Sequence, residues 1–197
     1  MAKIVISTNT SLDGVVQDPD GGEGFERGGW FAGFAAMGSS DRDAWVEVET
    51  AEAMRTQALL LGRHSYEWFA TRWAARGGAW ADRLNNLPKY VVSSSLPAEA
   101  ATWGPTTVLD GDVERAVTAI KGEIDGDVVV YASYQLGQTL MEHDLVDELR
   151  LFVHPCVLGD GKRLFGATTD RKPLRLVSCT TVGDGLPFLT YQVVRSA

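Results

Sequence analysis

The chain has 197 residues, of which 45% are hydrophobic and 22% are charged, and its formal net charge is −8. This length and composition argue against a disordered segment and indicate one globular domain spanning residues 1–197. A nucleic-acid-binding surface is not expected, because the 18 Lys and Arg residues are scattered and no basic run is longer than two.

The cysteine and hydropathy patterns indicate a soluble, cytoplasmic protein. Cys156 and Cys179 lie in strand-like stretches without a C-x-x-C spacing, so we expect two buried thiols in a reducing compartment. The first residues turn polar too soon for a secretory signal, and no apolar run approaches the ~20 residues that span a bilayer. His64, His143 and His154 lack the spacing of a zinc site, so no metal is expected.

Strand and helix patterns alternate along the chain. Lys3 to Thr8 is a compact β-branched run, and the long Gly- and Asp-rich segment after it is either functional or mobile. Asp41 can cap the first helix. The predicted strands are residues 3–8, 58–61, 89–93, 106–109 and 127–132, a strand-rich stretch at 145–158, and residues 174–182 and 189–194. One predicted helix begins near Asp41, and three others cover residues 64–73, 113–124 and 133–143.

The order of these elements predicts an α/β fold. Strands alternate with helices over the first three quarters of the chain, which indicates a parallel sheet covered by helices on both faces. Strands then follow strands, with a turn at residues 183–187, which indicates an antiparallel pair at the edge of the sheet. We therefore predict a three-layer α/β/α domain with a mixed, mainly parallel sheet and a C-terminal antiparallel strand pair.

Short polar turns follow three of the predicted strands, at the place where open α/β sheets bind ligands. These turns are residues 61–66, 92–95 and 131–135. Arg63 adds a planar guanidinium suited to a phosphate, and the N–H groups and hydroxyls of the three turns could together hold the phosphates of a dinucleotide. Taken singly, each turn is better explained structurally, with Gly62 making a tight turn and Arg63 lying on the surface.

Several common catalytic signatures are absent from the sequence. It contains no G-x-G-x-x-G after the first strand, no G-x-x-x-x-G-K-[ST], no G-x-S-x-G, and no H-x-E with P-C-x-x-C. The usual dinucleotide and P-loop motifs, hydrolysis by an activated serine and zinc-dependent deamination therefore find no support.

Asp13 and Trp30 are candidates for a substrate pocket. Asp13 closely follows the first strand, so its carboxyl could face the mouth of the sheet and supply or orient a proton. An Asp-Gly pair also commonly makes a simple turn, and both explanations stay open. Trp30 follows Gly28-Gly29 in the irregular region and could form an aromatic wall for a flat substrate.

Blocks spread over nearly the whole chain resemble the dihydrofolate reductase-like superfamily. More narrowly, the chain is similar to stand-alone bacterial relatives of the reductase domain of the riboflavin-biosynthesis deaminase/reductase, the RibD C-terminal domain family. Each block is weak alone, and the resemblance comes from their order and spacing. The blocks are SLDG at 11–14, GGW at 28–30, LGRHSYE at 61–67, KYVVS at 89–93, LVDELRL at 145–151 and PCVLGDGKRLF at 155–165.

This resemblance implies NADPH lying across the strand ends, and usually a homodimer. It assigns the cofactor phosphates to Gly62, Arg63, His64 and Ser65, the region of the 2′-phosphate to Ser93 and Ser94, and the pyrophosphate to residues 131–136, among them Ala132, Ser133, Gln135 and Leu136. Two residues depart from the family pattern. Ala132 stands where Gly is common and could crowd the phosphate. Ser94 stands where Arg is common, which leaves Arg63 as the main basic contact and weakens the preference for NADPH over NADH.

On the substrate side, folate reductases place an acid on their first helix, and Asp43, Glu47 and Glu49 occupy the corresponding stretch. We name Asp43, Glu47 and Trp30 as substrate-binding candidates and Asp13 as the catalytic one. The riboflavin-pathway substrate carries a ribose phosphate, and the sequence shows no clear second basic cluster for it, so neither substrate is chosen.

The function that the resemblance implies is an NADPH-dependent reductase. It would transfer a hydride to a small pterin- or pyrimidinone-like heterocycle, as 5-amino-6-(5-phosphoribosylamino)uracil reductase and dihydrofolate reductase do. Two alternatives stay open: a non-catalytic nucleotide- or ligand-binding protein of the same fold, and a structural dimer that binds no nucleotide.

Overall fold

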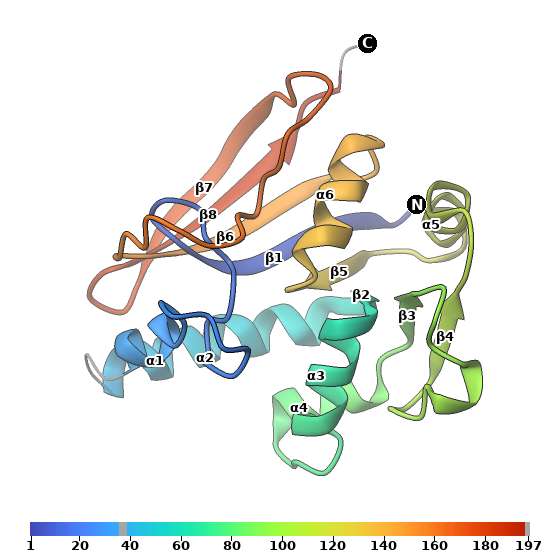
Figure 1. The fold of residues 1–197 in the computed structure, drawn as a ribbon, viewed down its shortest axis with the longest axis horizontal. Coiled ribbons are helices and arrows are strands. Elements are labelled where there is room, and N and C mark those ends of the chain that lie inside the picture. The colour runs from blue at the N-terminus through green and yellow to red at the C-terminus, as the bar shows by residue number, and fades with distance from the viewer. Residues whose placement is uncertain (36–38, 196–197) are drawn as a thin grey trace.

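The computed structural model describes residues 1–35 and 39–195, which form one eight-stranded sheet with helices on both faces (Figure 1). The strands are β1 (Lys3–Ser11), β2 (Thr56–Gly62), β3 (Lys89–Val92), β4 (Thr106–Leu109), β5 (Asp127–Tyr131), β6 (Glu148–His154), β7 (Leu174–Val182) and β8 (Leu186–Val193). The helices are α1 (Trp30–Ala35), α2 (Ser39–Arg55), α3 (Arg63–Trp73), α4 (Ala79–Asn86), α5 (Val113–Glu123) and α6 (Tyr134–Glu142), with a 3₁₀ turn at Ala98–Ala100.

The strand order is β4-β3-β2-β5-β1-β6-β8-β7. The strands from β4 to β6 in this order are all parallel, whereas β8 runs antiparallel to both of its neighbours, β6 and β7. The predicted α/β class, with its mainly parallel sheet and C-terminal antiparallel pair, is therefore confirmed. Because six strands run in parallel, their carboxyl ends share one edge of the sheet, which is where α/β proteins bind ligands.

The central strand β1 packs against helices on both faces. Ile4 and Ile6 point into the layer with α5 and α6, and Val5 points into the layer with α2, α3 and α4. All three side chains are at most 1% exposed. Side chains alternate between the two faces of a strand, so an uninterrupted β-branched run such as this one fits only a strand that is buried on both sides.

Three features differ from the sequence predictions. β1 extends three residues beyond Thr8, and the short helices α1 and α4 had not been predicted. α4 buries only Ala81 and Leu84, too short a stripe to show a helical period in the sequence. The expectation of two buried thiols is wrong for Cys179, which is exposed on the edge strand β7, while Cys156 is half-buried.

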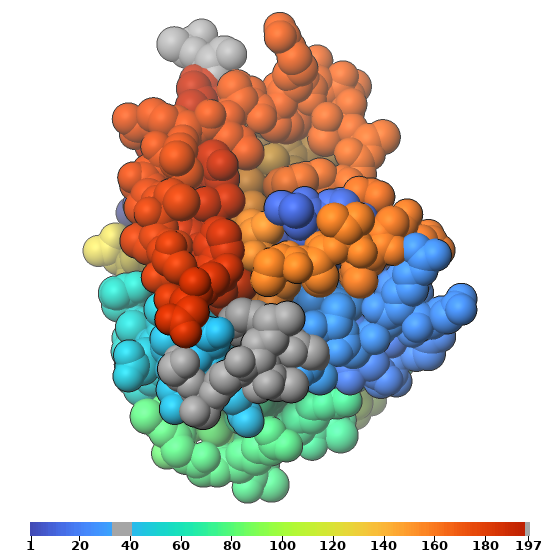
Figure 2. Space-filling model, turned by 90° about the vertical axis from the view of Figure 1, so that its left-hand side faces the viewer, coloured from blue at the N-terminus to red at the C-terminus, as the bar shows by residue number. Residues whose placement is uncertain are grey.

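The C-terminal hairpin is joined to the start of α2. The Asp41 carboxylate accepts a hydrogen bond from the N–H of Asp184 in the β7–β8 turn. Figure 2 shows this turn, at the red-orange tip of the hairpin, reaching down to the cyan α2 region. The contact fixes the beginning of the long helix α2, which carries side chains of the candidate site.

No helix among the described residues is long and apolar enough to cross a membrane.

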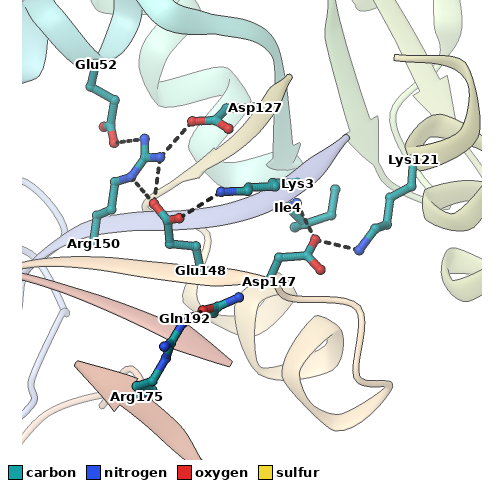
Figure 3. Close-up of polar contacts among 10 residues, drawn as sticks. All are labelled: Lys3, Ile4, Glu52, Lys121, Asp127, Asp147, Glu148, Arg150, Arg175 and Gln192. Atoms are coloured by element: carbon teal, nitrogen blue, oxygen red, sulfur yellow. Dashed lines mark hydrogen bonds and ion pairs between the residues drawn. The ribbon is translucent and has the colours of Figure 1, made fainter. Parts of the chain in front are cut away.

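A buried ion-pair network fixes the other end of α2 to the sheet (Figure 3). Arg150 of β6 binds Glu52 of α2 at 2.9 Å, Asp127 of β5 at 2.7 Å and Glu148 of β6 at 2.7 Å. Lys3 lies 3.5 Å from Glu148 on its other side. The Glu52 side chain is only 3% exposed, so Arg150 supplies the neutralising charge that a buried carboxylate needs.

We expect Arg150→Met to destabilise the fold by about 3–5 kcal/mol, because it leaves the buried Glu52 carboxylate unpaired. Adding Glu52→Gln to this variant should restore part of the loss, since an amide is less costly to bury than a charge. Urea unfolding followed by circular dichroism measures both. The matched control is Arg175→Met on the exposed strand β7, which should change stability by less than about 0.5 kcal/mol. A loss below about 1 kcal/mol for Arg150→Met would contradict this account.

Candidate functional site

A cavity of about 880 Å³ opens at the carboxyl ends of β1, β2, β3 and β5. The strands contribute Ser7 to Asn9, Gly62, Val92 and Tyr131 to its wall. The first turns of α3 and α6, the inner face of α2, and the loop of residues 16–23 complete it. Its volume lies at the upper end of the range for small-molecule sites.

One end of the cavity is rich in hydrogen-bond donors. Here the β2–α3 turn and the β5–α6 turn are joined by two hydrogen bonds, from Gly62 N to Ser133 Oγ and from Ser133 N to Ser65 Oγ, both 3.0 Å. Neither α3 nor α6 has a side-chain cap at its N-terminus. Their first N–H groups and the positive ends of their dipoles therefore meet at one place, which favours an anion.

The turn before α6 has an unusual backbone. Ala132 and Ser133 adopt positive φ angles of 51° and 52°. This left-handed region suits glycine, and side-chain-bearing residues occupy it at a cost. The conformation gives a physical reason why Gly is common at the position of Ala132. The alanine methyl group lines the cavity, but the turn keeps its shape.

Arg63 lies at the rim of this donor-rich end. Its Nε donates to Glu67 Oε1 at 2.8 Å, and its Nη1 donates to Ser95 Oγ at 2.8 Å. Nη2 has no hydrogen-bond partner among the described residues. The guanidinium is thus partly compensated by one carboxylate, its side chain is 45% exposed, and the cavity beside it is open.

A contact across the cavity mouth involves His64. Its Nε2 lies 3.1 Å from Glu23 Oε1, in the Gly- and Asp-rich loop. Asp18 holds this loop in shape, because its carboxylate accepts hydrogen bonds from the N–H groups of Glu23 and Phe25. Asp18, Glu23 and His64 therefore position the loop over the start of α3.

The opposite part of the cavity contains a buried acid, Glu49 of α2. The residue is 6% exposed and lines the cavity, and it has no hydrogen bond or ion pair with any described residue. Burial raises the pKa of Glu49 well above its usual value, and the nearby charge of Glu52 raises it further. Glu49 is therefore a carboxyl group that holds its proton more tightly than an ordinary glutamate.

Two further buried polar groups accompany Glu49. Ser7 of β1 and Tyr131 of β5 are paired in register, and Tyr131 packs in the core layer beneath α2. Ser7 Oγ lacks a hydrogen-bond partner among the described residues, the Tyr131 hydroxyl lies beside the Glu52 carboxylate, and both Ser7 and Tyr131 line the cavity. Burial raises the pKa of Tyr131 far above that of a free tyrosine, so its hydroxyl stays protonated.

The structure brings most of the predicted cofactor residues together. Those that line the cavity are Gly62, Arg63, His64, Ser65, Ala132, Ser133, Gln135 and Leu136. Ser93 and Ser94 do not line it. Ser93 Oγ accepts hydrogen bonds from the N–H groups of Ser95 and Leu96, and Ser94 is exposed. Since Ser95 in turn binds Arg63, this turn lies directly beside the guanidinium.

The predicted catalytic residue Asp13 lies outside the cavity. Its carboxylate accepts hydrogen bonds from Leu158 N at 3.0 Å, Ser11 Oγ at 2.8 Å and Gly159 N at 2.8 Å. These donors, Leu158 first, lower the pKa of Asp13 to about 2. The side chain thus ties the end of β1 to the loop after β6 as an ionised group.

The predicted substrate residues Trp30, Asp43 and Glu47 are also outside the cavity. The Trp30 indole donates to the carbonyl of Gln17 at 2.9 Å, and its ring packs edge-on against His154. Asp43 and Glu47 are exposed on the outer side of α2. Helical spacing could have singled out Glu49 among the acids of α2. It lies four residues from both Trp45 and Ala53, and these three residues share the inward face of the helix.

The comparisons with known proteins agree with this fold. A sequence model of the RibD C-terminal domain matches residues 2–188. A putative riboflavin biosynthesis protein from Shewanella sp. PV-4 superposes with a TM-score of 0.68 at 18% identity, covering 99% of this chain and 100% of that one. Dihydrofolate reductase from Enterococcus faecalis, complexed with NADP(H), superposes with a TM-score of 0.55 at 15% identity, covering 97% and 96%.

Two relatives match over only part of their length. A diaminohydroxyphosphoribosylaminopyrimidine deaminase/5-amino-6-(5-phosphoribosylamino)uracil reductase from Thermotoga maritima has a TM-score of 0.62 at 12% identity, covering 98% of this chain and 57% of that one. The Bacillus subtilis protein YyaP is 32% identical over 83 residues, which is 42% of this chain and 44% of YyaP. The structural similarities show the shared fold, and activity has to be argued from the site.

We expect Glu49→Gln to stabilise the protein at neutral and alkaline pH. A raised folded-state pKa means that Glu49 favours the fold below the ordinary glutamate pKa, and that this contribution is lost as the pH rises through the folded-state value. Melting temperatures measured from pH 4 to pH 9 should therefore coincide near pH 4 and diverge by a few degrees, about 2–4 °C per kcal/mol, at higher pH. Glu47→Gln, on the exposed face of the same helix, is the control and should show no such divergence. Parallel curves for wild type and Glu49→Gln would show that Glu49 titrates normally.

Proposed function

Because this chain belongs to the RibD C-terminal domain family, we propose that it is an NADPH-dependent reductase that transfers a hydride to a small heterocyclic substrate. We treat residues 1–197 as a single reductase domain, since all eight strands join one sheet. The observation that carries the proposal is the division of one cavity into two ends, with anion-binding helix N-termini and Arg63 at one end and the buried acid Glu49 at the other.

The donor-rich end suits the phosphates of a dinucleotide. The uncapped first turns of α3 and α6 offer N–H groups from His64, Ser65, Gln135 and Leu136, and the two hydrogen bonds between the turns hold these groups in place. Preorganised donors of this kind lose little entropy when an anion binds. We assign the pyrophosphate to this end, against the turn formed by Ala132 and Ser133.

The adenosine end of the cofactor would lie beside Arg63. The guanidinium is hydrogen-bonded to Ser95, so the turn containing Ser93 and Ser94 is close to it and its hydroxyls can share a 2′-phosphate. Glu67 compensates part of the charge of Arg63. We therefore propose that NADPH is preferred over NADH by a modest margin.

At the other end, Glu49 would meet the substrate ring. When bound, NADPH supplies the hydride, and the contribution of the protein is to hold the ring and manage a proton. A carboxyl with a raised pKa can donate a proton or a hydrogen bond near neutral pH, whereas Asp13, with its pKa near 2, is ionised and already hydrogen-bonded. We therefore propose Glu49 for the acid role and assign to Asp13 the positioning of residues 155–159.

A homodimer is the second part of the proposal. β7 is a nine-residue edge strand, and eight of its residues are exposed, among them Leu174, Leu176 and Val177. Natural proteins rarely leave a long apolar edge strand open, because it pairs readily with another chain. We propose that a second copy covers this hairpin.

The free thiols of Cys156 and Cys179 further suggest a reducing, cytoplasmic location.

A non-catalytic ligand-binding protein is the alternative function. The pairing of Arg63 with Glu67 favours it, and so does Ala132, which lines the cavity where a glycine would leave more room, since each weakens phosphate binding. Oxidation of NADPH in the presence of candidate pterins, pyrimidinones and quinones separates the two. Turnover with any of them supports the reductase, and tight NADPH binding without turnover supports the alternative.

We expect Arg63→Gln to weaken NADPH binding about tenfold or more, because a charge-assisted hydrogen bond contributes about 1.5–3 kcal/mol. The affinity for NADH, which lacks the 2′-phosphate, should change less. Quenching of tryptophan fluorescence gives both dissociation constants. Arg76→Gln is the control, since the Arg76 guanidinium stacks on Trp73 at 4.6 Å and does not line the cavity. Equal NADPH affinities in wild type and Arg63→Gln would remove Arg63 from the site.

A further inference from the structure

The cavity has a strongly uneven distribution of charge. Among its lining residues in the described part of the chain, Arg63 is the single Lys or Arg, and it lies at the end assigned to the cofactor. The acids that line the cavity away from that residue are Asp18, Asp20, Glu23 and Glu49. An anionic group on the substrate, in addition to the phosphates of the cofactor, would therefore enter a region with no Lys or Arg in its wall.

Three of these acids belong to the loop over the mouth. Asp18 is held by two backbone N–H groups, and Glu23 faces His64. Burial raises the pKa of Asp20, and the positive charge of Arg72 opposes this effect. Arg72 is not one of the lining residues; its guanidinium stacks on the ring of Trp68, which is, at 4.2 Å. At the mouth the three acids therefore outnumber the basic groups beside them, His64 and Arg72.

The floor carries an independent sign of a ligand. Glu49 is 94% buried, lines the cavity and has no hydrogen-bond partner among the described residues, and the hydroxyl of Ser7 is buried and unpartnered as well. Buried polar groups are nearly always hydrogen-bonded in folded proteins. A carboxyl and a hydroxyl are satisfied by a ring that presents N–H donors and a carbonyl oxygen.

The space beside this floor is aromatic. Phe69 and Trp73 of α3 and Trp80 of α4 line it, with the rings of Trp73 and Trp80 4.5 Å apart. The two indole N–H groups are buried and have no acceptor among the described residues. Such walls hold a flat apolar group by stacking, and they offer hydrogen bonds to an oxygen atom but no charge to a phosphate or a carboxylate.

Building on the proposed reductase function, we infer that the substrate is a flat, N–H-bearing heterocycle that is neutral or cationic and carries neither a phosphate nor a carboxylate. Its ring edge meets Glu49 and Ser7, and any extension lies between the aromatic walls. This class differs from the phosphoribosyl-bearing uracil named for the Thermotoga maritima relative. Burying an anion without a compensating cation costs several kcal/mol in a low-dielectric site, and this part of the wall has no Lys or Arg, so the wall itself rejects phosphorylated compounds.

The inference is tested with three matched probes that share a 2-amino-4-oxopyrimidine ring. They carry a benzyl group, a 4-carboxybenzyl group or a 4-(aminomethyl)benzyl group, which are neutral, anionic and cationic at pH 7. Calorimetry of the full chain with saturating NADP⁺ gives each dissociation constant. We expect the neutral and cationic probes to bind at least tenfold more tightly than the anionic one.

Variants of α2 identify the side chain responsible. Glu49→Gln keeps the shape of the side chain but replaces the carboxyl group that meets the shared ring, so it should weaken all three probes at least tenfold. Glu47→Gln, exposed on the same helix, should match the wild type with all three probes. Binding of NADP⁺ to Glu47→Gln should be unchanged within about twofold, because Glu47 does not line the cavity.

The outcomes distinguish a failure of the proposed reductase function from a failure of the inferred substrate class. If NADP⁺ fails to bind, the proposed function fails. If NADP⁺ binds but the carboxybenzyl probe binds as tightly as the benzyl one, or if neither the neutral nor the cationic probe binds, the inferred substrate class is wrong. Unchanged probe binding in Glu49→Gln would likewise overturn the role given to Glu49.

Discussion

Two hydrogen bonds between neighbouring turns hold the candidate site together. Through them, Ser133 Oγ accepts the N–H of Gly62 and Ser65 Oγ accepts the N–H of Ser133, so the starts of α3 and α6 cannot separate without breaking both. Parallel pairing of β2 with β5 brings the two turns to the same edge of the sheet, and the serines fix their mutual distance. The positive ends of two helices are thereby held side by side, which is the arrangement that an anionic ligand needs.

The opposite end of the cavity depends on how α2 is anchored. Asp41 holds the start of the helix against the β7–β8 turn, and Arg150 holds Glu52 near its end. Arg150 is paired with Glu52, and the negative charge of Glu52 lies close enough to Glu49 to favour its protonated form. The same ion pair that stabilises the sheet therefore sets the chemistry of the buried acid one turn away. Destabilising groups of this kind are commonly retained where function requires them.

Much of the fold could be predicted from the sequence, because the β-branched runs of the central strands have no other stable placement than a sheet buried on both faces. The turn containing Gly62 to Ser65 could be placed at the ligand-binding edge for the same reason, since the carboxyl ends of parallel strands lie together. Short elements such as α4 could not be predicted, because two buried residues are too few to show the helical repeat in the sequence.

The substrate side was harder to predict for a physical reason. The choice among Asp43, Glu47 and Glu49 depends on how α2 is rotated about its axis, which the contacts with the sheet and the hairpin decide. The structural role of Asp13 could not be predicted either, because only the folded chain brings the N–H groups of Leu158 and Gly159 to its carboxylate. Ser7 carried no signal in the sequence, since its importance comes from the absence of a hydrogen-bond partner for its hydroxyl in the folded core.

A crystal structure of the chain soaked with NADPH tests the central claim most directly. We expect the pyrophosphate between the first turns of α3 and α6, the 2′-phosphate beside Arg63, and the nicotinamide turned toward Glu49. A nucleotide bound elsewhere on the molecule, or an empty cavity at saturating NADPH, would contradict the account.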